Sequence, residues 1–304
     1  MLIANPVPTQ ALTHQLLTEK QLELSVKRLD LVHPDVSGNK FYKLKYNLQE
    51  AKKQGKRRIL TFGGAFSNHI FSTASAAHIE ELEAIAVIRG ERIEPLNPTL
   101  AYAEKMGMKL HFISREDYRK KNTMEVLTQL KELYGEFYLI PEGGTNDLAI
   151  HGTSEILSEN ENQFSHICVS IGTGGTFAGI AKSLTSPQKL IGFSSLKGEF
   201  IRDEIEVMLA KNNSSTSGSY EIRTDYHFGG YAKYTPELID FLGWFHSSFG
   251  IILDPIYTGK MAFGMWDLIK NDFFQAGSKL LMIHTGGLQG NAGFTMRTGI
   301  KIPN

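Results

Sequence analysis

Short apolar runs alternate along the chain with segments whose apolar residues recur every three or four positions. Short apolar runs between polar or glycine residues are typical of buried strands, and periodic segments are typical of amphipathic helices. The apolar runs predict strands over 59–62, 84–88, 109–113, 137–140, 166–171, 189–193 and 279–284. The periodic segments predict helices over 68–81, 98–106, 122–134 and 236–249. This alternation indicates an α/β protein with parallel strands.

Three periodic segments each place apolar residues on one helix face, as in amphipathic helices. The first follows Lys40, and the other two lie in the predicted helices over 122–134 and 236–249. The three faces consist of Phe41, Leu44, Leu48 and Ala51; of Met124, Leu127, Leu130 and Tyr134; and of Leu238, Leu242, Phe245 and Phe249.

Composition excludes several classes of protein. The 304 residues contain 32 Lys and Arg against 32 Asp and Glu, so the formal net charge is zero and we expect neither a nucleic-acid nor a membrane partner. The single cysteine, Cys168, lies in an apolar run and is expected to be a buried structural thiol. We find no signal peptide and no membrane-length apolar stretch, so we expect a cytoplasmic protein.

Candidate chemistry begins with the segment Ser37–Leu44, in which Lys40 stands at the start of a predicted helix. The positive pole of the helix dipole lies there, and it would lower the pKa of the amine and favour the neutral, nucleophilic form. Considered alone, such a lysine is more often a surface residue than a functional one.

Two glycine segments each lead from a predicted strand into a helix. Gly63–His69 contains Ser67 and Asn68, which could cap the helix or present backbone N–H groups to a carboxylate. Gly172–Gly179 gathers N–H groups and threonine hydroxyls that could bind an anion such as phosphate. It matches neither a dinucleotide fingerprint nor a Walker loop, and a plain tight turn is the alternative.

The last segment is Leu253–Lys260, followed later by His284–Leu288. Its Tyr257 could be a core tyrosine, and Thr258 a helix cap. The chain shows no zinc-ligand spacing, no nucleophile elbow and no paired catalytic carboxylates. We therefore expect no metal, and a phosphate-bearing organic cofactor is the hypothesis left by these segments.

Together and in this order, the four segments resemble the pyridoxal-phosphate enzymes of the tryptophan-synthase-β fold, within the D-cysteine desulfhydrase and 1-aminocyclopropane-1-carboxylate deaminase family. The resemblance runs from about Lys27 to Gly290. It implies fold type II, with two open, twisted, mostly parallel sheets and flanking helices. It also implies a large cofactor-binding domain of residues 1–44 and 141–304, with a small domain, 45–140, inserted between them. The cofactor would lie in the cleft between the two.

The resemblance assigns a role to each segment. Lys40 would carry pyridoxal 5′-phosphate as a Schiff base and shuttle the α-proton, and Lys43 would help bind the phosphate. Ser67 and Asn68 would hold the substrate carboxylate and the phenolic oxygen of the cofactor, with His69 beside them. The remaining implied residues are Gly172, Thr173, Gly174, Gly175 and Thr176 around the phosphate, Tyr231 and Tyr257 near the cofactor ring and substrate, and Thr258 and Thr285 on the cofactor, with Thr258 at its pyridine nitrogen.

The two threonines separate the branches of the family. The deaminase branch typically has glutamate and leucine where this chain has Thr258 and Thr285, and desulfhydrases have threonine at both. A threonine gives the pyridine nitrogen no formal counter-charge, which suffices when a good leaving group departs from the β-carbon. Ser37 and Phe66 depart from the family pattern of glycine and glutamine, and both changes concern the substrate pocket.

The sequence thus predicts a lyase that converts D-cysteine, a small amino acid, to pyruvate, hydrogen sulfide and ammonia. Two alternatives stay open: a 1-aminocyclopropane-1-carboxylate deaminase giving 2-oxobutyrate and ammonia, and a cofactor-binding or amino-acid-sensing protein with little turnover. The family also implies a homodimer. The remaining hypothesis is an unrelated α/β protein whose glycine turns match the family by coincidence.

Overall fold

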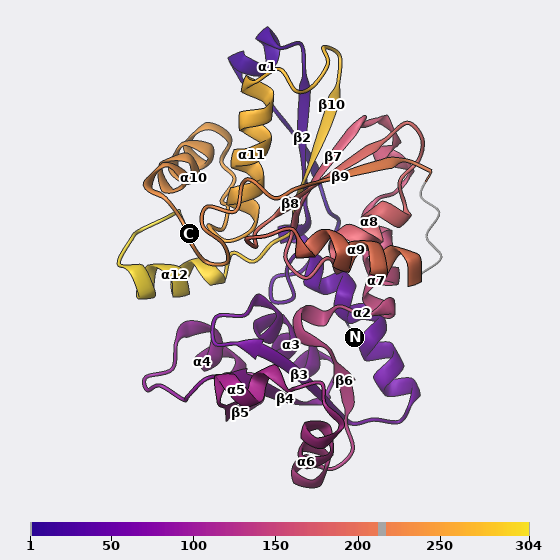
Figure 1. Cartoon of the computed structure of the whole chain (residues 1–304), viewed down its shortest axis with the longest axis vertical. Helices are drawn as coiled ribbons and strands as arrows, with labels where there is room; N and C mark the ends of the chain where they lie inside the picture. The colour runs from indigo at the N-terminus through magenta and orange to yellow at the C-terminus, as the bar shows by residue number, and fades with distance from the viewer. Residues whose placement is uncertain (1, 212–216, 304) are drawn as a thin grey trace.

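The computed structural model describes residues 2–211 and 217–303, which form two β-sheets with helices packed around them (Figure 1). The six-stranded sheet contains, in spatial order, β1 (Thr9–Leu12), β2 (Glu23–Arg28), β10 (Lys279–His284), β7 (His166–Ile171), β8 (Lys189–Ser194) and β9 (Ser219–Arg223). The four-stranded sheet contains β5 (Lys109–Ile113), β4 (Glu83–Arg89), β3 (Arg58–Gly64) and β6 (Tyr138–Ile140).

Parallel pairing dominates both sheets. Every pair in the four-stranded sheet is parallel, and in the six-stranded sheet only β1 runs antiparallel to its neighbour β2. The inner strands are buried on both faces, as in β7, where all residues after His166 are buried. Continuous burial explains why these strands read as unbroken apolar runs rather than as alternating ones.

The helices cover the sheets in two lobes, which Figure 1 shows one above the other. Helices α2 and α7 lie where the lobes meet, and they pack against each other. The α-helices are α1 (Gln15–Glu19), α2 (Asn39–Lys53), α3 (Asn68–Ile79), α4 (Pro98–Lys105), α5 (Arg115–Arg119), α6 (Met124–Tyr134), α7 (Asp147–Thr153), α8 (Gly175–Lys182), α9 (Phe200–Lys211), α10 (Pro236–Phe249), α11 (Thr258–Lys270) and α12 (Gly290–Thr298).

All seven predicted strands and all four predicted helices are present, and they correspond to β3 to β8, β10, α3, α4, α6 and α10. Cys168 is fully buried in β7, as predicted. The apolar face that follows Lys40 is also buried. Met124 belongs to the predicted face of α6, but its side chain is 80% exposed because it stands at the first turn of the helix, beyond the packed part of the face.

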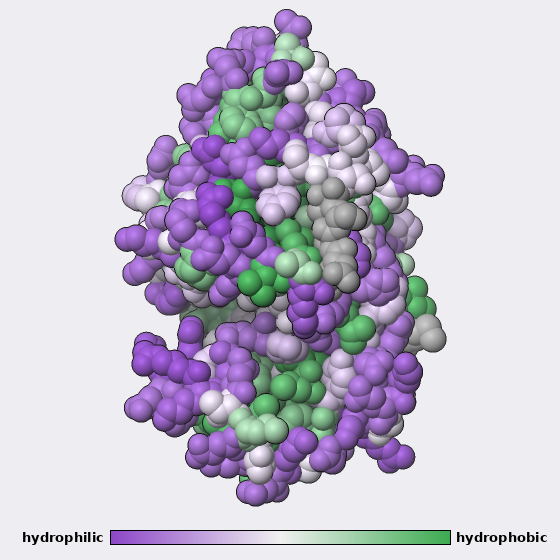
Figure 2. Space-filling model, turned by 45° about the vertical axis from the view of Figure 1, so that its right-hand side comes forward, coloured by the Kyte–Doolittle hydropathy of each residue, from purple (hydrophilic) through white to green (hydrophobic). Residues whose placement is uncertain are grey.

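The strands divide by sequence in a simple way. All four strands of one sheet fall between Arg58 and Ile140, and the strands of the other lie before and after that range. Helix α2 runs across the boundary expected between residues 44 and 45, so the domain limits themselves stay a prediction. On the face shown in Figure 2, the outline narrows between the lobes, and hydrophobic residues gather along the middle of a largely hydrophilic surface.

Within residues 2–211 and 217–303, no helix is long and apolar enough to cross a membrane. The same part of the chain holds no group of three or more His, Cys, Asp or Glu side chains that could bind a metal ion.

Candidate active site

A cavity of about 890 Å³ lies between the lobes and is lined by residues of both. Its walls include the start of α2 and the loops that follow the carboxyl ends of the parallel strands β3, β4, β6, β7 and β10. Crevices of this kind are where open α/β sheets bind their ligands, and the volume suits a cofactor-sized molecule. The loops with predicted chemistry therefore meet in one place.

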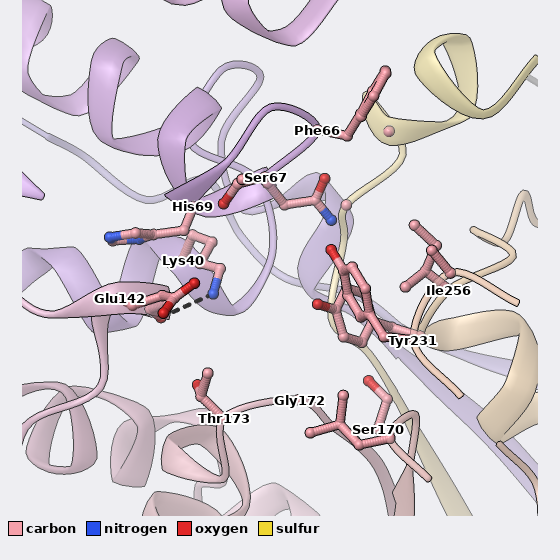
Figure 3. Close-up of a pocket in the computed structure, with 18 of the residues that line it drawn as sticks. Lys40, Phe66, Ser67, His69, Glu142, Ser170, Gly172, Thr173, Tyr231 and Ile256 are labelled. Atoms are coloured by element: carbon pink, nitrogen blue, oxygen red, sulfur yellow. Dashed lines mark hydrogen bonds between the residues drawn. The ribbon is translucent and has the colours of Figure 1, made fainter. Parts of the chain in front are cut away.

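Lys40 reaches this cavity from the first turn of α2, which begins at Asn39. Its Nζ donates a hydrogen bond of 3.0 Å to the carbonyl oxygen of Gly143, the contact drawn as a dashed line in Figure 3. Burial lowers the pKa of this amine to about 8. A lowered pKa was predicted from the helix dipole, and loss of solvent is the cause that the structure shows.

The start of α2 is held by the end of β10. Gly38 has a φ of +70°, and a Cβ added there would lie 1.9 Å from the backbone oxygen of Thr285. The backbone N–H of Asn39 donates to the same oxygen at 3.2 Å, and its side chain donates to Thr176 at 2.7 Å. Only glycine permits this approach, so Gly38 sets the depth at which Lys40 enters the cavity.

Lys43, one turn further along α2, lies in a corner rich in hydrogen-bond donors. Its Nζ is 2.8 Å from the hydroxyl of Thr145 and 3.3 Å from that of Thr173, and the side chain is 2% exposed. Gly174, in the left-handed conformation at φ +78°, precedes the N-terminus of α8. A lysine, two hydroxyls and a helix N-terminus are a suitable set of donors for a phosphate.

Ser67 and Asn68 stand where β3 gives way to α3. Ser67 is the N-cap of α3, and its hydroxyl accepts a hydrogen bond from the backbone N–H of Ile70 at 3.4 Å. Ser67 therefore has the helix-capping role that the sequence allowed. Both residues also line the cavity. The Asn68 side chain reaches the other lobe, where a Cβ on Gly287 would meet its amide nitrogen at 2.5 Å and one on Gly290 its oxygen at 3.2 Å.

His69 lies deeper and is only 2% exposed. Its Nε2 is 2.7 Å from the hydroxyl of Thr61, and its Nδ1 is 3.4 Å from that of Thr73. Burial, with Lys40 and Lys43 nearby, lowers the pKa of the imidazole well below its usual value. His69 is therefore a neutral residue in the wall of the cavity.

Two tyrosines enter from the side of the cavity opposite Lys40, where Figure 3 labels Tyr231. The rings of Tyr231 and Tyr257 are 6.1 Å apart in an edge-to-face arrangement. Burial raises the pKa of both phenols, that of Tyr257 well above its usual value. Both keep their protons over the whole physiological range.

The predicted threonines differ in position. Thr285 lines the cavity, and its hydroxyl is 3.1 Å from that of Ser170. Thr258 is fully buried and is not among the residues that line the cavity; its hydroxyl donates to the carboxylate of Asp254 at 2.5 Å. Gly175 likewise lies behind the cavity wall, whereas Gly172, Thr173, Gly174 and Thr176 line it.

Sequence reasoning missed several residues of the site. Gly143 and Thr145 belong to a Gly-Gly-Thr segment after β6, the same strand–glycine–threonine signal that marked the phosphate loop after β7. Arg89, which ends β4 and lines the cavity, carried no recognisable signal. Asp254 accepts from the N–H groups of Ile256, Tyr257 and Thr258, so it fixes the turn that begins α11.

A buried amine of low pKa beside a corner of phosphate-binding donors fits one class of cofactor, an aldehyde that carries a phosphate. The fold and this site together define a fold-type II pyridoxal-phosphate enzyme.

The comparisons agree. The family model described as "Pyridoxal-phosphate dependent enzyme" matches residues 5–286, and the chain belongs to that family. A putative 1-aminocyclopropane-1-carboxylate deaminase of Pyrococcus furiosus is 34% identical over 92% of this chain and 88% of its own length. A mitochondrial bifunctional D-cysteine desulfhydrase/1-aminocyclopropane-1-carboxylate deaminase of Arabidopsis thaliana is 33% identical over 88% and 73%. A crystal structure of an ACC deaminase homologue superposes with a TM-score of 0.84 at 29% identity, covering 98% of this chain and 94% of that one.

Proposed function

We propose that this enzyme is a D-cysteine desulfhydrase, which turns D-cysteine and water into pyruvate, hydrogen sulfide and ammonia. The observation that carries the proposal is the placement of Lys40, a buried amine of pKa about 8, in one cavity with the Gly172–Thr176 loop. The bifunctional relative, named for this activity among two, supports the choice of substrate.

Lys40 is the proposed attachment point and proton carrier. Bound pyridoxal phosphate supplies an electron sink for the α-carbon of the substrate. The neutral Nζ of Lys40 can then accept the α-proton, because an amine of pKa about 8 is partly deprotonated at neutral pH. Its hydrogen bond to the Gly143 oxygen keeps the nitrogen on the cavity side of α2.

The phosphate corner would hold the cofactor in place. Lys43, Thr173 and Thr145 surround one point with donors, and the N-terminus of α8 adds backbone N–H groups. Burial and nearby Lys40 lower the pKa of Lys43 well below its usual value, and a bound phosphate dianion would favour its charged form again.

The opposite walls would bind and orient the substrate. Ser67 and Asn68 present a hydroxyl and an amide to its carboxylate. Tyr257 and Tyr231 hold protons that can be donated to the departing sulfur, since the pKa of each phenol lies above its usual value. His69, neutral and bonded within the wall, orients neighbouring groups instead of carrying a proton.

The second candidate is 1-aminocyclopropane-1-carboxylate deamination. The name of the 34% identical relative favours it, whereas threonine at positions 258 and 285 favours desulfhydration. Purified enzyme with its cofactor should be assayed with D-cysteine, L-cysteine and the cyclopropane acid in parallel. We expect turnover of D-cysteine; turnover of the cyclopropane acid alone would make the enzyme a deaminase.

The cofactor assignment has its own test. We expect the purified enzyme to show the visible absorbance band of lysine-bound pyridoxal phosphate, and we expect Lys40→Ala to abolish both the band and turnover, by more than about 1,000-fold for the latter. A band that persists in Lys40→Ala would place the cofactor on another lysine.

We also propose that the enzyme works as a homodimer in the cytoplasm. The free, buried Cys168 suits a reducing compartment, and the homodimer follows from the family resemblance. Light scattering on the purified protein would measure its mass; a monomer at micromolar concentration would contradict the dimer.

A further inference from the structure

Lys260, in the first turn of α11, is a buried lysine outside the machinery described above. The residue is 1% exposed, although α11 begins only two residues earlier. Its Nζ donates two hydrogen bonds of 2.8 Å, one to the carbonyl oxygen of His227 and one to that of Gly230. Both acceptors belong to residues 227–232, which we call the Tyr231 loop.

The Tyr231 loop has an unusual backbone. Phe228, Gly229, Gly230 and Ala232 all have positive φ angles, of 52°, 93°, 115° and 55°. For Phe228 and Ala232 this conformation is strained and persists only where surrounding contacts enforce it. The ammonium of Lys260 lies where two carbonyls of the loop converge, so it supplies such contacts.

The buried amine of Lys260 has no carboxylate within ion-pair distance among the residues that the structure describes. Across residues 2–211 and 217–303, the hydrogen-bond partners of its Nζ are the two loop carbonyls. Burial lowers its pKa to about 8, and the more distant carboxylate of Asp254 offsets this only in part. Burying an amine without a counter-ion is unfavourable, and a hydrophobic residue would cost less. The two loop carbonyls that accept its hydrogen bonds are therefore the groups that account for a lysine at this position.

We propose that Lys260 is a positioning residue that fixes Tyr231 in the cavity by holding the carbonyls of His227 and Gly230. The Tyr231 side chain is 44% exposed, so packing alone fixes it weakly, and its ring meets Tyr257 at an edge. This inference rests on the proposed function only in that Tyr231 contacts the substrate.

Two substitutions of equal length separate the hydrogen bonds from the volume of the side chain. Lys260→Met fills the space without a donor, and Lys260→Gln keeps N–H donors. Lys270→Met, at the exposed end of α11, is the matched control. In hydrogen exchange on the full-length enzyme with its cofactor, we expect Lys260→Met to speed exchange in the Tyr231 loop at least about 10-fold, Lys260→Gln less, and Lys270→Met not at all.

Kinetics then test whether Lys260 acts through Tyr231. We expect Lys260→Met to lower kcat/KM for D-cysteine about 10-fold or more, with partial rescue by Lys260→Gln. In a Tyr231→Phe background the same substitution should change kcat/KM less than about 2-fold, because the group it positions is already lost. The proposal would be overturned if Lys260→Met lowered kcat/KM as much in the Tyr231→Phe background as in the wild-type enzyme. An unchanged rate of hydrogen exchange in the Tyr231 loop of Lys260→Met would also overturn it.

The proposed function can fail separately. If the wild-type enzyme turns over neither D-cysteine nor the cyclopropane acid, the hydrogen-exchange rates of the Tyr231 loop still test the role of Lys260. The kinetic cycle is then replaced by binding of unreactive D-alanine, followed as a shift of the visible band. Lys260→Met should weaken that binding in the wild-type background and not in Tyr231→Phe; equal weakening in both would overturn the proposal. If Lys260→Met does not fold, Lys260→Gln carries both measurements, with smaller expected changes and the same deciding comparisons.

Discussion

At the scale of single residues, solvent exclusion determines the chemistry of the site more than sequence neighbours do. The pKa of Lys40 falls because protein surrounds its amine, and the pKa of Tyr257 rises for the same reason. One environment therefore lowers the pKa of an amine and raises the pKa of a phenol on opposite sides of a cavity.

The pKa of Lys40 predicts how the enzyme acquires its cofactor. At pH 7 roughly a tenth of the molecules would have a neutral Lys40, against fewer than about one in a thousand for an ordinary lysine. The rate of cofactor attachment to the enzyme stripped of cofactor should therefore rise up to about pH 8 and then level off. Stopped-flow absorbance measures this rate, with a free lysine derivative as control. A rate that keeps rising to pH 10 would show an unperturbed amine.

The sequence predicted individual site residues where a backbone pattern marked them. Lys40, Ser67 and Thr173 all stand within three residues of a glycine near an expected helix start, and each lines the cavity. Arg89 and Asp254 were missed, because only folding decides that the end of β4 faces the cavity and that a carboxylate caps the turn before α11. Whether Thr258 contacts the cofactor stays a prediction.

At the scale of elements, buried parallel strands were predictable and edge elements were not. Strand β4 has an unbroken buried core from Ala84 to Ile88, so its sequence alone indicates a strand. β1 is a short edge strand whose first residues are exposed or half-exposed, and it carries no comparable apolar run. Its place depends on pairing with β2, which a local pattern cannot reveal.

The contact between the start of α2 and the end of β10 gives a prediction with an internal control. Gly38 and Gly55 have nearly the same φ, +70° and +67°, yet an added Cβ meets the Thr285 backbone at Gly38 and nothing within 4 Å at Gly55. Gly55→Ala should lower the free energy of unfolding by about 1 kcal/mol, which is strain alone. Gly38→Ala should lower it by at least about 2 kcal/mol more.

Urea unfolding of both variants without cofactor measures this difference. Gly38→Ala should also slow cofactor attachment, because displaced backbone moves Lys40. Equal destabilisation by the two substitutions would mean that the close approach to Thr285 is not needed.

At the scale of the molecule, the cavity lies between the two sheets, and residues from both lobes line it. Asn68 from one lobe touches the Gly287–Gly290 segment of the other, and a ligand between them would add contacts to both. The fold class and the alternation of elements were predictable from the sequence, whereas a cavity between the two lobes was expected only from the family resemblance.

Removal of the cofactor should therefore destabilise the enzyme. A ligand present at about 100 times its Kd stabilises the folded state by about 2.7 kcal/mol, or about 5 °C in Tm for a chain of this size. Calorimetry of the enzyme with and without cofactor measures the shift, and Lys40→Ala should shrink it. Identical melting temperatures would indicate that the cofactor does not bind the folded enzyme in preference to the unfolded chain.

The pairing of β2 with β10 also bears on how the chain is made. Strand β2 ends at Arg28, and its parallel partner begins at Lys279. At the 5–20 residues per second of a ribosome, β2 waits roughly 10–50 s for that partner, while the sheet between Arg58 and Ile140 is already complete. During synthesis the smaller sheet can fold first, and the N-terminal strands stay unpaired on one side until the last strand emerges. The nascent chain is most exposed to aggregation and to chaperones in that interval.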